Sequence, residues 1–378
     1  MPRPRRRALL LAALVAGGAA AGCGGEDGPQ RPNVIVPPGA AAGPAPPAPR
    51  LTAAQLAGQH VVFPIAGHTA PRALRARIRR GEAAGVILLA RTALTVAQVR
   101  RLTARLQRIP RPAGLRAPLL VMVDQEGGPV KRLPGAPARS PRELAAAGSA
   151  DLARAEGRAT ARTLRAAGVN VALAPVLDVA RRGSAIAREG RALGATPQAV
   201  ARVGVAFAEG LQQGGVAATA KHFPGFGAAT RNTDDGEAVI DLPAATLRRV
   251  DGAPFAAAVR RGVAMVMLAS ARYPGLSAEP AVLSPAVVGE ELRDRLHFRG
   301  ITVSDDLEAP ALVPYGGAPG AAVRAMRAGV DLVLCARSYA GAAGAARAVA
   351  DALRAGELDR AGAEASLRRL LAARAAWR

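Results

Sequence analysis

Short apolar runs and amphipathic stretches alternate along this chain from about residue 51 onward. Apolar runs without polar alternation predict strands that are buried on both faces, as in parallel sheets. The expected strands lie near His60–Ile65, Val86–Ala90, Leu119–Val123, Val169–Leu177, Val216–Ala220, Val263–Ala269, Ile301–Val303 and Leu332–Cys335. Stretches at helical spacing are found near 71–83, 96–108, 151–167, 197–213, 245–261, 285–296, 318–328, 338–355 and 359–377.

Eight strand–helix alternations predict an α/β fold, a (β/α)8 TIM-type barrel that forms one domain over residues 51–378. An open, doubly wound sheet is the structural alternative. A dinucleotide-binding sheet of that kind carries a Gly-x-Gly-x-x-Gly turn after its first strand, and no such turn follows the first expected strand here. In a barrel, functional side chains gather at the carboxyl ends of the strands.

The first 50 residues follow a different pattern. A basic start, Arg3 to Arg7, leads into an apolar stretch over residues 8–21 that is short for a membrane span and typical of a signal-peptide core. Small residues before Cys23 resemble a bacterial lipoprotein cleavage site, which predicts a signal peptide over 1–23 and lipidation of Cys23. An ordinary secretory signal with an incidental cysteine is the alternative. Residues 24–50, rich in Pro, Gly and Ala, are expected to tether the domain to the outer face of the cytoplasmic membrane.

The formal net charge is +23, and only Lys131 and Lys221 are lysines among the 51 basic residues. Such an excess fits either a polyanionic partner or an arginine-rich solvated surface. The arginines are spaced along the expected helices without interleaved aromatic residues, which form 3% of the chain, so nucleic acid is not expected as a partner. An anionic polymer of the cell wall suits the expected compartment better. The sequence does not indicate the oligomeric state.

Polar side chains follow several expected strands at the end where a barrel has its active site. In chain order they are Asp124, Gln125 and Glu126 after the third strand, Asp178 and then Arg191 after the fourth, Lys221 and His222 after the fifth, Ser270 after the sixth, and Asp305 and Asp306 after the seventh. Carboxylates, an arginine and a lysine around one mouth suit a neutral polyhydroxylated ligand, because charged groups make the stronger hydrogen bonds to hydroxyls. No His/Cys/Asp cluster shows ligand spacing, so neither a metal nor an organic cofactor is expected.

Several segments, in this order, resemble the motifs of family 3 glycoside hydrolases, specifically the single-domain β-N-acetylglucosaminidases. They are Val123–Gly128, Ala174–Val179, Arg191–Gly194, Lys221–Gly227, Tyr273–Pro274, Leu283–Pro285 and Ser304–Leu307. The resemblance implies a retaining glycosidase without a cofactor. Its substrate would be a carbohydrate, terminal β-linked N-acetylhexosamine or a related β-glycoside, in the turnover of cell-wall glycan.

The same resemblance implies roles for individual residues. Asp305 would be the nucleophile, which attacks the anomeric carbon to form a glycosyl-enzyme intermediate. The residues expected to contact sugar hydroxyls are Asp124, Arg191, Lys221 and His222. Three further carboxylates are expected in support, namely Asp306 to position Asp305, Glu126 to fix the Gly-rich turn, and Asp178 as a hydrogen-bond partner.

The loop after the fifth expected strand departs from the family pattern. In the N-acetylglucosaminidases it carries an Asp-Ser-His or Asp-Thr-His triplet whose His is the general acid/base. Counted from Gly227, the triplet here reads Asn232-Thr233-Asp234, so Asp234 is the expected acid/base, with Asp235 as the alternative. A carboxylic acid is the usual general acid of glycosidases, but an ordinary Asp pKa of about 3.9 must rise by roughly two to three units for this duty near neutral pH. A solvated turn over 234–236 is the plain alternative.

The missing histidine leaves two functions open. One is a surface-tethered β-N-acetylhexosaminidase that uses Asp305 and an acid from the Asp234 loop. The other is a carbohydrate-binding lipoprotein that kept the sugar pocket and lost turnover. A solute-binding lipoprotein for a transporter predicts two similar lobes joined by a hinge, whereas the pattern here predicts one barrel.

Overall fold

The computed structural model describes residues 51–89 and 95–377. The predicted signal peptide, the tether and the lipidation site Cys23 lie outside the described residues. Within these two ranges, none of the helices combines the length and the hydropathy that a membrane span requires.

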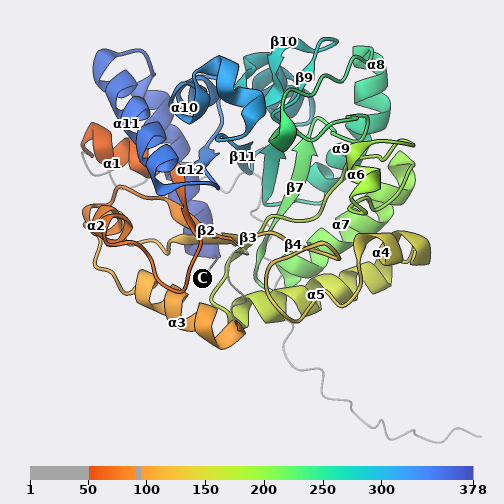
Figure 1. Ribbon diagram of the computed structural model, residues 1–378, viewed down its shortest axis with the longest axis horizontal. Coiled ribbons are helices and arrows are strands. Elements are labelled where there is room, and N and C mark those ends of the chain that lie inside the picture. The colour runs from red at the N-terminus through yellow and green to blue at the C-terminus, as the bar shows by residue number, and fades with distance from the viewer. Residues whose placement is uncertain (1–50, 90–94, 378) are drawn as a thin grey trace, which may run out of the picture. The chain divides into compact units, whose positions relative to one another are not determined.

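Eight parallel strands close into a barrel in the order β1-β12-β11-β8-β7-β6-β3-β2 (Figure 1). Their bounds are β1 Val61–Ile65, β2 Gly85–Leu88, β3 Leu120–Val123, β6 Val171–Ala172, β7 Ala217–Phe223, β8 Met265–Leu268, β11 Ile301–Asp306 and β12 Leu332–Leu334. The closed sheet confirms the predicted barrel and excludes the open doubly wound alternative. Within these eight strands, Asp305 is the most exposed residue.

Three strands end three or more residues away from the predicted position. β6 is shorter, because the regular ladder stops before Pro175, which lacks an N–H to donate; beyond it only an isolated bridge from Val176 to Lys221 and single backbone hydrogen bonds join the chain to β7. β7 and β11 are longer, since Lys221–Phe223 and Ser304–Asp306 still belong to the sheet. Polar site residues therefore lie within the rigid strands.

Helices surround the barrel and connect successive strands. The longer helices are α2 Arg72–Arg80, α3 Val96–Gln107, α5 Ala150–Ala166, α7 Pro197–Gln213, α9 Ala253–Arg260, α10 Gly317–Arg327, α11 Tyr339–Ala355 and α12 Arg360–Ala376. The shorter ones are α1 Ala53–Gly58, α4 Pro141–Ala147, α6 Ala185–Arg188, α8 Ala244–Thr246, η1 Thr233–Asp235, η3 Ala281–Leu283 and η5 Pro310–Tyr315. Two small hairpins pair β4 Gln125–Gly127 with β5 Val130–Lys131, and β9 Arg272–Tyr273 with β10 Ser277–Pro280.

Two predicted helices are irregular. The helix expected over 245–261 is divided into α8, the π-helical η2 (Leu247–Asp251) and α9. Gly252 and Pro254 lie at the junction, where proline cannot donate to the preceding turn. The helix expected over 285–296 is the π-helical η4 (Ala286–Arg295).

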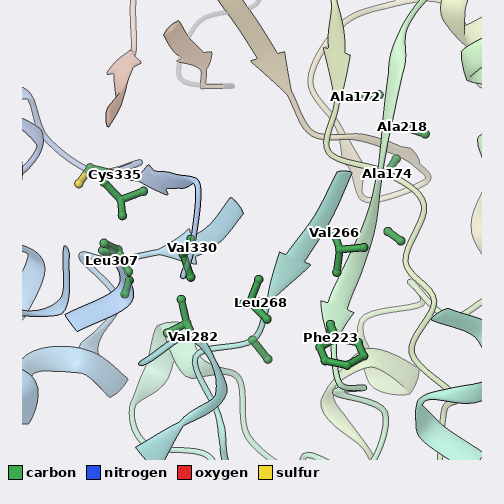
Figure 2. Packing of buried hydrophobic residues seen from close by; sticks show 14 of the residues in the cluster. Ala172, Ala174, Ala218, Phe223, Val266, Leu268, Val282, Leu307, Val330 and Cys335 are labelled. Carbon is green, nitrogen blue, oxygen red and sulfur yellow. The ribbon is translucent and has the colours of Figure 1, made fainter. Parts of the chain in front are cut away.

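The hydrophobic core has an inner layer inside the barrel and an outer layer between strands and helices. In the inner layer, side chains such as Met122 and Met265 pack with Leu370 and Trp377 of α12 or its end. Figure 2 shows part of the outer layer, in which side chains of β7 and β8 pack beside each other.

The helix α12 covers the end of the barrel where the strands begin. Arg374 is fully buried and donates to the carbonyls of Ala117 and Pro118, directly before β3. Asp331, directly before β12, is also fully buried and accepts from Arg293 and Arg369 at 2.6 and 2.7 Å. With this end closed, the carboxyl ends of the strands form the mouth available for a site.

Candidate active site

A buried charge cluster lies at the ends of β3 and β7. The Nζ of Lys221 lies 2.7 Å from Oδ1 of Asp124 and 2.7 Å from Oε1 of Glu126. Arg191 binds Glu126 twice, through Nε to Oε2 at 2.9 Å and Nη2 to Oε1 at 2.8 Å. The Lys221 and Glu126 side chains are almost inaccessible, whereas those of Asp124 and Arg191 are 20% and 13% exposed. The cluster thus presents one acceptor and one donor group to the mouth.

The opposite charges of this cluster stabilise one another. Burial favours the neutral form of Glu126, but Lys221 and Arg191 outweigh it and lower the pKa of Glu126 to about 2. Burial likewise opposes the charge of Lys221, but Asp124 and Glu126 raise its pKa. Two cations and two anions balance, so the cluster suits an uncharged ligand with many hydroxyls.

The support role expected for Glu126 takes a different form. Its carboxylate binds the cations Lys221 and Arg191 and, among the described residues, makes no hydrogen bond within the Gly-rich turn that follows it. Gly127 shapes that turn, because its φ is 101° and a Cβ there would lie 2.7 Å from the carbonyl of Arg139.

Asp178 holds His222 and the start of the loop after β7. It is fully buried, and its Oδ2 lies 2.8 Å from Nδ1 of His222. Its Oδ1 accepts from the backbone N–H groups of His222 and Phe226 at 3.1 and 2.7 Å. Among the described residues, Nε2 of His222 has no hydrogen-bond partner, which leaves this atom available to a ligand.

Asp305 and Asp306 end β11 in different environments. Oδ1 of Asp305 accepts from the backbone N–H of Asp306 at 2.8 Å, and its other oxygen has no hydrogen-bond partner in the described ranges. The Asp306 carboxylate instead accepts from the N–H groups of Glu308 and Ala336 and from Nε of Arg337. Burial, helped by the charge of Asp305, raises the pKa of Asp306 to about 6. Asp306 therefore positions Asp305 through its backbone, while its carboxylate binds the segment after β12.

The Asp234 loop reaches across the mouth to the same place. η1, which contains Asp234 and Asp235, packs against η5, the turn after β11. Arg337 joins the two sides, with Nη2 2.8 Å from Oδ1 of Asp234 and Nε 3.0 Å from Oδ2 of Asp306. Asp235 is exposed and has no side-chain hydrogen bond or ion pair among the described residues. Of the two predicted acids, Asp234 is the one linked to the strand that ends in Asp305 and Asp306.

The surroundings of Asp234 favour protonation. Partial burial and the negative charge of Asp305 raise the pKa of Asp234, and Arg337 opposes this effect. The side chain remains 60% exposed, so the desolvation is incomplete.

Asn232 links this loop to the charge cluster. Its Oδ1 caps η1 by accepting from the N–H of Asp234 at 3.1 Å, and its Nδ2 donates to Oε1 of Glu189 at 2.9 Å. The other oxygen of Glu189 lies 2.9 Å from Nη1 of Arg191. The acid loop and the predicted sugar-contacting residues thus share one hydrogen-bonded network.

Two residues of this arrangement were not predicted from the sequence. Arg337 follows the eighth barrel strand, and a polar residue at that strand end was a signal of the same kind as those used for the other strands. Glu189 lies two residues before Arg191 in a long loop, and nothing in the local sequence marks it.

Comparisons with known proteins agree with one another. The profile of the family described as "Glycosyl hydrolase family 3 N terminal domain" matches residues 53–373. An "Uncharacterized secreted glycosyl hydrolase" of Arthroderma benhamiae is 36% identical over 76% of this chain and 83% of that protein. A "Beta-hexosaminidase" of Xanthomonas oryzae pv. oryzae is 37% identical over 66% of this chain and 75% of that protein.

Solved structures give the same result. A glycoside hydrolase family 3 β-N-acetylglucosaminidase from Paenibacillus sp. str. FPU-7 superposes with a TM-score of 0.81 at 35% identity. The match covers 86% of this chain but only 63% of the Paenibacillus chain, less than two thirds of its length. A β-N-acetylhexosaminidase from Beutenbergia cavernae superposes with a TM-score of 0.79 at 30% identity, over 86% of this chain and 98% of that one.

Proposed function

Because this chain belongs to glycosyl hydrolase family 3 and is a glycoside hydrolase, we propose that it is a retaining β-N-acetylhexosaminidase that uses Asp305 as its nucleophile. Its substrate is a glycan fragment that ends in a β-linked N-acetylhexosamine, of the kind released from cell walls. The similar proteins named β-hexosaminidase and β-N-acetylglucosaminidase support this substrate class. One observation carries the proposal: Asp305 is the most exposed residue of the barrel strands, and one of its oxygens has no hydrogen-bond partner among the described residues.

The proposed reaction has two displacements. In the first, the free oxygen of Asp305 bonds to the anomeric carbon, the glycosidic C–O bond breaks, and Asp234 gives its proton to the leaving oxygen. In the second, Asp234 takes a proton from water, the water oxygen bonds to the anomeric carbon, and the bond to Asp305 breaks. Two inversions give net retention. Asp124, Arg191, Lys221 and His222 hold the sugar through its hydroxyls.

A second candidate function rests on the ion pair between Asp234 and Arg337, since Arg337 stabilises the ionised carboxylate. If Asp234 stays ionised, natural glycosides lack an acid, and the protein binds sugars without turning them over. Aryl glycosides with an activated leaving group need no acid. Activity on these but not on natural disaccharides would place the defect in the Asp234 loop.

The nucleophile is tested by trapping. A 5-fluoro N-acetylglucosaminyl fluoride should form a stable covalent adduct, and peptide mapping should locate this adduct on Asp305. The Asp305→Asn variant should neither be labelled nor hydrolyse aryl glycosides, while its melting temperature stays close to that of the parent. Labelling at another carboxylate would overturn the assignment of Asp305.

We further propose export and lipid anchoring at Cys23. The similarity to a protein named as secreted supports export. Cells that express the full chain and are fed an alkyne fatty acid should yield a labelled protein, and the Cys23→Ala variant should not be labelled. Equal labelling of the parent and the Cys23→Ala variant would contradict lipidation at Cys23, and the N-terminal segment would then be an ordinary secretory signal.

A further inference from the structure

The positive charge of the domain is concentrated in its first quarter. Residues 51–123 hold twelve arginines and a single acidic residue, Glu82, whereas residues 124–378 hold 33 basic and 25 acidic residues. The first segment is therefore far from balance, and it forms the part of the barrel wall that contains α2 and α3 (Figure 1). We call the outer surface of these two helices and the loop after α3 the basic face.

Most arginines of the basic face have no counter-charge. Eight are exposed and make no ion pair with the described residues, namely Arg72, Arg75, Arg79, Arg100, Arg101, Arg105, Arg108 and Arg116. Many arginines of other helices do have one: Arg154 pairs with Glu209, and Arg248 with Glu291. Arg101 and Arg105 lie one helical turn apart, where like charges destabilise a helix. An external anion would remove this repulsion.

A small pocket between α2 and α3 lies within the basic face. Its volume is about 60 Å³, and it is lined by the polar residues Arg75, Arg105, His68 and Thr69 and by the apolar residues Ala70, Leu102, Leu106 and Ile109. Nη1 of Arg75 donates to the carbonyl of Ala70 at 3.0 Å, which leaves its other donors for a ligand. The two guanidinium groups and the hydroxyl suit one phosphate group, and the apolar part of the lining suits the carbon atoms next to the phosphate of a lipid.

We propose that the basic face docks on an anionic phospholipid surface, with one lipid phosphate in the pocket between α2 and α3. Residues 66–123 contain no aromatic side chain, so the face lacks the stacking groups that single-stranded nucleic acid requires. The described chain begins beside this face, because Gln55 of α1 donates to the carbonyl of Arg80 at the end of α2. The 50 residues before it contain the basic and apolar segments predicted to address a membrane. The lipid anchor, itself a proposal, would hold the domain near a membrane, and the arginines of the basic face would contact the anionic lipids.

The test uses the full chain and vesicles of phosphatidylcholine with or without one third phosphatidylglycerol. Arg100, Arg101 and Arg105 of α3 and Arg108 directly after it are replaced by Gln, which keeps helix propensity; we call this the α3 variant. The matched control replaces Arg202, Arg249, Arg260 and Arg347, which are exposed, unpaired among the described residues and spread over separate elements. Both variants lose the same charge and keep the same N-terminal segment.

Each basic residue near an anionic membrane strengthens binding roughly fivefold. The parent should bind the anionic vesicles more tightly than the neutral ones, and more weakly at high salt. The α3 variant should lose about a hundredfold or more of that binding, and the control variant much less. Equal losses in the two variants, or equal binding to both kinds of vesicle, would overturn the proposal. Binding of millimolar inorganic phosphate to a parent that binds both kinds of vesicle equally would also overturn it, because the pocket would then be a site for free phosphate. No step of this assay depends on glycoside hydrolysis.

Discussion

Replacement of Arg337 by Gln should move the alkaline limb of the pH profile upward. Arg337 is the one cation seen to touch the proposed acid Asp234, at 2.8 Å, and it stabilises the ionised form of that carboxylate. A general acid must be protonated in the first displacement, so the rate falls as pH rises through its pKa. Removing Arg337 raises that pKa, and the fall should therefore begin at a higher pH.

The size of the effect follows from the exposure of the pair. The Arg337 and Asp234 side chains are 41% and 60% exposed, so solvent screens them and the pair stabilises by about 0.3–1 kcal/mol. One pKa unit corresponds to about 1.4 kcal/mol, which gives a rise of about half a pKa unit and roughly three times more protonated Asp234 above its pKa.

The assay is kcat/KM against pH for a natural disaccharide, which reports the acid of the free enzyme. The Arg337→Lys variant is the control, because it keeps the charge and should keep the limb of the parent. An activated aryl glycoside, which needs no acid, should show no such limb in any variant. The assignment of Asp234 as an acid tuned by Arg337 would be refuted if the alkaline limb of Arg337→Gln lay at the pH of the parent. It would also be refuted if Arg337→Lys shifted the limb as far as Arg337→Gln does.

Three further outcomes are expected. Asp234→Ala should slow natural disaccharides at least a hundredfold more than aryl glycosides, whereas the exposed Asp235→Ala should change neither rate by more than a few fold; equal slowing of both substrates in Asp234→Ala contradicts the acid role. The pKa of Glu126 falls from 4.5 to about 2 on folding, so its stabilisation, about 3 kcal/mol, is present above pH 4.5 and is lost as pH falls toward 2. Urea unfolding of Glu126→Gln should therefore show a weaker loss of stability over that pH range than the parent, and an identical slope would contradict the pairing. Asp331→Asn should lower the free energy of unfolding by about 3 kcal/mol, because it leaves two arginines at the barrel base without their buried partner, and thermal or urea unfolding measures this.

The barrel could be predicted because its physics is local. Parallel strands buried on both faces are continuous apolar runs, and each run here became a strand at the expected place. The predicted strand ends were wrong where polar residues stay in the sheet. Lys221 remains within β7 because Asp124 and Glu126 neutralise its charge. A search for apolar runs cannot detect such a partner. Pro175, which cannot donate a hydrogen bond to a neighbouring strand, is a sequence signal for the early end of β6.

The candidate site was predictable only in part. Residues at strand ends could be named, since the topology brings those ends to one rim. Contacts between loops could not be predicted, because they depend on how two irregular segments pack against each other. Arg337 and Asp234 are 103 positions apart in sequence, and Glu189 reaches Asn232 from a loop without a motif. Such pairs are set by side-chain geometry that periodicity does not contain.

The substitution of the expected histidine by Asp234 changes how the acid can be controlled. A histidine with an adjacent Asp would be tuned inside its own triplet, whereas the pKa of Asp234 is raised by the charge of Asp305 and lowered by Arg337. In the proposed cycle, Asp305 is ionised before the first displacement, and its charge favours protonation of Asp234 when an acid is required. Once Asp305 is esterified by the sugar that charge is gone, the pKa of Asp234 falls, and Arg337 stabilises the ionised base that must take a proton from water. The nucleophile would thus set the protonation state of its partner at each step, and a carboxylic acid in place of the histidine is compatible with turnover.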